Sequence, residues 1–133
     1  MASKHVEDAV QAYLVANWTT APVLVENELG EGPEDGSPFV RLQFPASSVD
    51  RPFIDQRYYR EEGGFRLVLA VERGIGTPKI REWGDQLADL FRDKQFDGVI
   101  TKVPSEPFTD DLSDQGNYFV GTMIVPYEYR FEG

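Results

Sequence analysis

A stretch of regularly alternating side chains, residues 56–73, restricts the possible folds of this chain more than any other feature. Its apolar set shares one face of an extended strand and consists of Phe65, Leu67, Leu69 and Val71. The set on the other face is Arg66, Val68, Ala70 and Glu72. Gly63 and Gly64 interrupt the pattern and predict a bulge or bend, because strand residues resume at once. A strand with one apolar face requires neighbouring strands and an apolar layer packed on that face.

Two amphipathic helices are predicted to form that layer. In the first, residues 3–17 with Ser3 as the N-cap, the residues at helical spacing are Val6, Ala9, Val10, Tyr13 and Leu14. The second is expected to start at Thr77 and Pro78, which suit the N-cap and the first helical position. Its apolar stripe consists of Ile80, Trp83, Leu87, Leu90 and Phe91.

Four further segments carry strand patterns: residues 22–25, 39–44, 96–103 and 118–131. The segments between them that are rich in Gly, Pro, Ser or acidic residues are predicted to be irregular, and they are 27–38, 45–55 and 104–117. This order predicts an α+β fold, a mostly antiparallel β-sheet or sandwich with two packed helices. The 133 residues suit a single domain, residues 1–133.

Charge and composition argue against several classes of function. Thirteen Lys and Arg residues against 23 Asp and Glu residues leave a net charge of −10, which disfavours binding to nucleic acids or anionic membranes. No cysteine is present, so disulfides, cysteine-ligated metals and thiol nucleophiles are excluded. The single histidine, His5, lies near the N-terminus. The longest near-apolar run, residues 67–71, is too short to span a membrane, and no signal peptide is expected.

The motifs that could carry chemistry are weak. Residues 74–79 lie between a strand and a helix and could hold an anion, but a tight turn with a helix cap is the favoured interpretation. Two acidic groups lack EF-hand spacing and are interpreted as solvated loop acids: Glu31, Glu34 and Asp35, and Asp110, Asp111 and Asp114. No serine lies in a nucleophile-elbow context. We therefore expect no enzymatic activity, no cofactor and no metal site.

A cluster of aromatic and arginine residues is the candidate partner interface. It comprises Phe53, Arg57, Tyr58 and Tyr59, and Arg51 and Arg60 lie beside it. Tyr and Arg are enriched at the residues that dominate protein–protein binding. The alternative is that Tyr58 or Tyr59 points inward and belongs to the core, because neighbouring strand residues face opposite sides.

The order of these parts resembles the tail terminator, or tail completion, proteins of long-tailed bacteriophages and prophages. The segments that carry the resemblance are Asn17-Trp18, Ala21-Pro22-Val23, Phe39-Val40-Arg41-Leu42, Gly64-Phe65-Arg66-Leu67-Val68-Leu69-Ala70-Val71, Gly74-Ile75-Gly76, Ala88-Asp89-Leu90-Phe91 and Val125-Pro126-Tyr127-Glu128-Tyr129. They extend over nearly the whole chain and match in layout and composition.

The resemblance implies a fold related to tail-tube proteins and a working form of six copies in a ring. Such a ring would cap the tail tube, end its polymerisation and present a surface to the head–tail connector, while DNA passes through its bore. Its implied partners are further copies, the tail tube protein and the connector, in the host cytoplasm during assembly and then in the virion tail. Two alternatives stay open: a head–tail joining protein of the neck, and a small acidic binding domain or hydrolase unrelated to phages.

Overall fold

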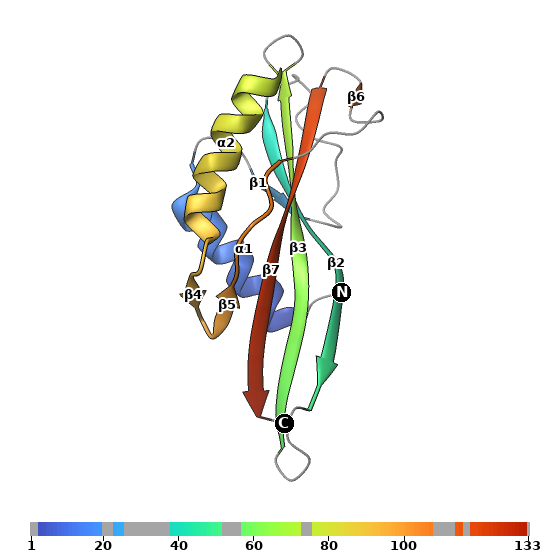
Figure 1. Cartoon of the computed structure of the whole chain (residues 1–133), viewed down its shortest axis with the longest axis vertical. Coiled ribbons are helices and arrows are strands. Elements are labelled where there is room, and N and C mark those ends of the chain that lie inside the picture. The colour runs from blue at the N-terminus through green and yellow to red at the C-terminus, as the bar shows by residue number, and fades with distance from the viewer. Residues whose placement is uncertain are drawn as a thin grey trace.

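The computed structural model in Figure 1 describes residues 3–19, 23–25, 38–51, 57–72, 76–107, 114–115 and 118–132. Its elements, in chain order, are α1 (Lys4–Asn17), β1 (Val23–Val25), β2 (Phe39–Asp50), β3 (Tyr58–Glu72), α2 (Gly76–Phe91), β4 (Gln95–Phe96), β5 (Val99–Thr101), β6 (Asp114–Gln115) and β7 (Tyr118–Glu132).

The strands form one sheet in the order β1-β2-β3-β7-β5-β4, and β6 pairs with β7. Every pairing is antiparallel except the one between β1 and β2. Both helices lie on the same side of the long central strands (Figure 1). The predicted α+β architecture, a mostly antiparallel sheet with two packed helices, is therefore confirmed.

The ladder between β3 and β7 forms the centre of the sheet and runs without a register shift from Tyr58 opposite Glu132 to Glu72 opposite Tyr118. The predicted bulge at Gly63-Gly64 is therefore wrong. The shift lies in the facing strand β2, between Gln43 and Ala46. Pro45 stands at that position, and a proline has no N–H to donate to a ladder.

The helix-covered face of the sheet forms the core, as the alternation predicted. Its strand residues Phe65, Leu67 and Leu69 are fully buried. From the helices, the buried apolar residues are Val6, Ala9, Val10, Leu14, Ile80, Trp83, Leu87 and Phe91. Aromatic contacts join the layers, with Phe65 edge-on to Phe91 at 5.1 Å between ring centroids. Both predicted amphipathic stripes therefore face the sheet.

Three predicted boundaries differ from the structure. The second helix begins at Gly76, so Thr77 and Pro78 lie inside its first turn. Strand β2 continues to Asp50, because the chain resumes ladder pairing with β3 after the shift at Pro45. The strand predicted at residues 96–103 is a short hairpin of β4 and β5, which turns at Asp97 and Gly98 with positive φ. Most of the predicted loop at 27–38 lies outside the described residues.

The close approach of α2 to the segment after β5 depends on a glycine. A Cβ placed on Gly84 would lie 2.2 Å from Cγ and 2.8 Å from Cδ of Pro107. These are ring atoms, which cannot rotate away. Only a residue without a side chain fits between the helix and Pro107.

Replacing Gly84 by Ala is therefore expected to destabilise the protein by about 1–2 kcal/mol, although Ala is the better helix former by about 1 kcal/mol. Urea unfolding measures the change. Gln86→Ala on the exposed side of α2 serves as the control and is expected to stay within about 0.5 kcal/mol of wild type. A Gly84→Ala variant more stable than wild type would contradict the close packing at Pro107.

Candidate interaction surface

The residues of the predicted interface cluster do not share one face of the sheet. Phe53 lies outside the described residues, and Arg57 is exposed just before β3 begins. Tyr58 and Tyr59 are both half-buried and, as successive strand residues, point to opposite faces. Tyr59 lies on the helix-covered face with Phe65, whereas Tyr58 lies on the other. The cluster therefore contributes to two surfaces.

Tyr59 belongs to a row of four stacked rings on the helix-covered face, near the start of α1. Its ring centroid lies 5.5 Å from that of Phe131, which lies 5.7 Å from Tyr129. Tyr129 stacks in turn on His5 at 4.7 Å, and Nε2 of His5 is 2.8 Å from the backbone oxygen of Asp97. The single histidine thus connects α1 to β7 by ring stacking and to the β4–β5 hairpin by one hydrogen bond.

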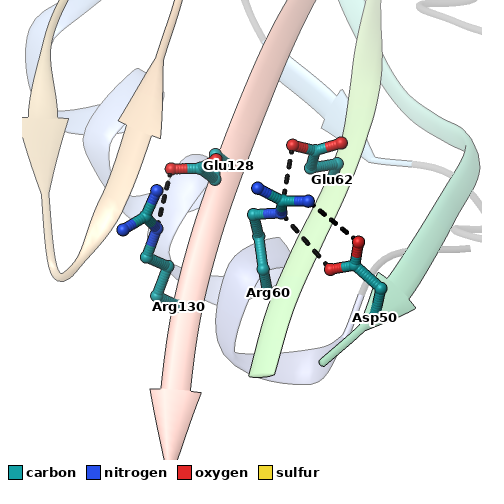
Figure 2. A network of polar contacts seen from close by, with 5 residues as sticks. All are labelled: Asp50, Arg60, Glu62, Glu128 and Arg130. Carbon is teal, nitrogen blue, oxygen red and sulfur yellow. Dashed lines mark hydrogen bonds and ion pairs between the residues drawn. The ribbon is translucent and has the colours of Figure 1, made fainter. Parts of the chain in front are cut away.

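The opposite side of the sheet carries a network of arginines and carboxylates, shown in Figure 2. Arg60 of β3 donates to Asp50 of β2, with Nη2–Oδ2 at 2.9 Å, and its Nε lies 3.2 Å from Oε1 of Glu62. On β7, Nε of Arg130 lies 3.1 Å from Oε2 of Glu128. The hydrogen bond to Asp50 raises the pKa of Arg60 above its ordinary value. Each pair is open to solvent, which screens the charges, so the pairs contribute little to the stability of the fold.

A buried carboxylate joins α1 to the sheet. Glu61 is 1% exposed and accepts two hydrogen bonds, from the Tyr127 hydroxyl at 2.6 Å and from the Ser3 backbone N–H at 3.2 Å. Ser3 precedes the helix, and its own side chain makes no capping hydrogen bond. Glu61 therefore caps the positive end of the α1 dipole in its place. Sequence reasoning missed this residue, although its spacing from Phe65 places it on the apolar face.

The hydrogen bonds of Glu61 have a structural role. Burial, followed by the hydrogen bond to Glu61, raises the pKa of Tyr127 well above its ordinary value of about 10. A tyrosine that holds its proton so firmly serves as a hydrogen-bond donor.

Of the acidic groups singled out in the sequence, Glu31, Glu34, Asp35, Asp110 and Asp111 lie outside the described residues. Within the described residues, no three His, Cys, Asp or Glu side chains lie close enough together to hold a metal ion. Of the possible anion loop at 74–79, residues 74 and 75 are outside the described residues, and Lys79 Nζ lies 5.8 Å from the ring centroid of Trp83. No helix in the described part of the chain is long and apolar enough to cross a membrane.

Replacing Tyr127 by Phe is expected to lower the free energy of unfolding at pH 7 by about 1–3 kcal/mol, because Glu61 stays buried without its hydroxyl donor. In the wild type, the unfolded chain loses the phenol proton near pH 10 while the folded protein keeps it, so stability falls as the pH rises above about 10. The variant lacks this contribution, and its stability is expected to fall less steeply. Urea titrations from pH 7 to 11 measure both effects.

Tyr58→Phe is the control, because the Tyr58 hydroxyl makes no hydrogen bond to any described residue. It is expected to match the wild type in its free energy of unfolding at pH 7. Equal pH slopes for wild type and Tyr127→Phe would contradict the raised pKa of Tyr127 in the folded protein.

The fold and these surfaces define a class: a small α+β protein in which one sheet face is covered by neither of the two described helices. The family model described as phage tail terminator protein matches residues 5–127. The chain therefore belongs to the phage tail terminator family and is a structural protein of the phage tail, with a part in virion assembly. Its place is the virion tail.

Comparison with solved structures supports the fold. One of them aligns with a TM-score of 0.63 over 100% of this chain and 99% of its own, at 21% sequence identity. At this identity the likeness shows a shared fold only. No curated protein matches the chain.

Proposed function

We propose that this tail protein forms a ring of six copies on the end of the tail tube, ends tube polymerisation and offers its outer surface to the head–tail connector. The family match over residues 5–127 carries the proposal, because it includes both helices and most of the central ladder. The ring assembles in the host cytoplasm and remains in the virion tail.

The charge of the chain suits a ring through which DNA moves. Six copies at −10 each carry about −60, which repels DNA phosphates from the bore and lets the genome pass without binding. The same charge makes copies repel one another in dilute solution. Association therefore has to rely on local contacts that bring opposite charges and apolar surface together.

A first test of the proposal is to add the purified protein to polymerising tail tube protein. Tubes are expected to become shorter with increasing amounts, and electron microscopy should show a ring at one tube end. In parallel, light scattering over a range of protein and magnesium concentrations should detect a species of about 91 kDa, six times the 15.1 kDa chain. Unchanged tube lengths and a monomer under all these conditions would contradict the proposal.

The outcome also separates the terminator from the neck-joining alternative. A protein that binds the connector and leaves tube lengths unchanged would act in the neck. A terminator is expected to bind the tube end in the absence of the connector.

The predicted interface residues Phe53, Arg57, Tyr58 and Tyr59 are proposed to contact a neighbouring copy or the tube. Arg57 allows a clean test because its side chain is exposed. Arg57→Glu is expected to weaken assembly while changing the melting temperature by no more than a typical surface substitution.

Tyr59→Ala is the contrasting variant, because it removes the stack on Phe131 and should lower the melting temperature. A large loss of thermal stability in Arg57→Glu would show that Arg57 stabilises the monomer, and its interface role would be abandoned.

A further inference from the structure

The two sides of this subunit present different surfaces. We call the side of β2, β3 and β7 that points away from both helices the helix-free face; its described members include Arg41, Gln43, Arg66, Val68 and Ile124. The register defines it: Arg41 lies opposite Val68, Gln43 opposite Arg66, and Arg66 opposite Ile124. In Figure 1, α2 lies on the other side of these strands, so its outward surface and the helix-free face point in opposite directions.

Two arginines of the helix-free face have no carboxylate partner within the described residues. The guanidinium of Arg41 lies 5.7 Å from the ring centroid of Phe39, and Arg66 makes one long hydrogen bond, 3.4 Å, to Oε1 of Gln43. Arg60 and Arg130, further along the same face, are already neutralised by Asp50, Glu62 and Glu128 (Figure 2). Among the arginines that the structure describes on this face, the two without a carboxylate partner thus lie in the part around Arg66.

Apolar surface lies next to this charge. Ile124, directly opposite Arg66 in the ladder, is 40% exposed, and Val68 is half-buried. An apolar centre beside arginines is typical of protein–protein contact surfaces.

The outer surface of α2 carries several carboxylates, beside the exposed Arg81. Glu82, Asp85 and Asp89 are all exposed, on the side of the helix opposite the buried stripe. Asp89 is paired with Arg92 at 3.0 Å, whereas Glu82 and Asp85 have no cationic partner in the described part of the chain. Counting only partners among the described residues, the subunit therefore has unpaired arginines on one side and unpaired carboxylates on the other.

The arginines of the helix-free face and the carboxylates of α2 lie at about the same height along the strands. Ile80 packs at Gly121, which pairs with Leu69, and Gly84 packs at Pro107. Pro107 follows shortly after Ser105, which donates its backbone N–H to the Ile124 oxygen. Gly84, with Glu82 and Asp85 on either side of it in the sequence, is thus close to the level of Ile124 and Arg66.

We propose that the helix-free face around Arg41 and Arg66 of one copy packs on Glu82 and Asp85 of α2 in the next copy. The inference rests on the proposed ring and names the surfaces that close it. A ring needs two different, complementary patches on opposite sides of each subunit, and a rotation about an axis along the strands brings residues of equal height together. This contact pairs opposite charges between subunits that otherwise repel each other.

Charge reversal and charge exchange test the contact. Arg66→Glu and Glu82→Arg are each expected to raise the protein concentration needed for ring formation at least about tenfold, and the double variant is expected to recover most of this loss. Lys94→Glu makes the same change in net charge as Arg66→Glu at an exposed position beyond the end of α2, and it should leave ring formation unchanged. Light scattering and the tube-capping assay serve as readouts.

Cross-linking tests the same contact without relying on the folding of Arg66→Glu. The chain has no cysteine, so Ile124→Cys and Gln86→Cys place single thiols on the helix-free face and on the outer surface of α2. When the two variants are mixed and oxidised, a disulfide-linked pair is expected. Val15→Cys, on an exposed position of α1, replaces Gln86→Cys in the control and should give no such pair.

The outcomes distinguish this inference from the proposed function. If the wild type caps tubes as a ring, but charge reversal has no effect or Ile124→Cys does not link to Gln86→Cys, the contact is wrong and the function stands. If the wild type neither self-associates nor shortens tubes, the proposed function fails and the contact fails with it. Recovery in the double variant together with the specific cross-link would establish the contact.

Discussion

The long antiparallel ladder between β3 and β7 is the constraint on which the rest of the structure depends. Its register runs unbroken from Tyr58 to Glu72 and sorts every side chain of these strands to one face or the other. A slip of one residue would turn Arg66 into the core and Leu67 out of it. The ladder therefore determines both what the helices cover and which charges are left for contact with other molecules.

The helix-covered face also contains the one buried carboxylate of the described core, Glu61. Because it accepts from Ser3 and from Tyr127, it ties the start of α1 to β3 and β7 at the same point. Such a group is costly to bury without donors, so the position of the helix terminus and the sheet register depend on each other. The row of rings from His5 to Tyr59 holds the same end of the molecule together by stacking.

Periodicity predicted the parts of the fold that depend on burial, and it failed where local backbone chemistry decides. The core residues of α1 and α2, such as Val6 and Ile80, recur at helical spacing, and those of β3 and β7 alternate along the strand. Both patterns can be recognised in the sequence because the same residues are buried. The predicted strand at residues 39–44 ends before Pro45, because a proline normally ends a strand. In the structure, β2 continues past Pro45, which lies at a register shift. Within residues 96–103, the Asp97-Gly98 pair is typical of a tight hairpin turn, and the prediction of a single strand does not take it into account.

The candidate surfaces show a different limit of sequence reading. Alternation already implied that Tyr58 and Tyr59 face opposite sides, but no periodic pattern tells which arginines find a partner within the chain. That depends on cross-strand neighbours: Arg60 lies opposite Asp50, while Arg66 lies opposite Ile124 and Gln43. Pairing across strands thus neutralises one part of the helix-free face and leaves another part charged. Each subunit has a net charge of −10, so copies repel one another over most of their surface. A patch of positive charge such as the one around Arg66 is where two copies can meet without this repulsion.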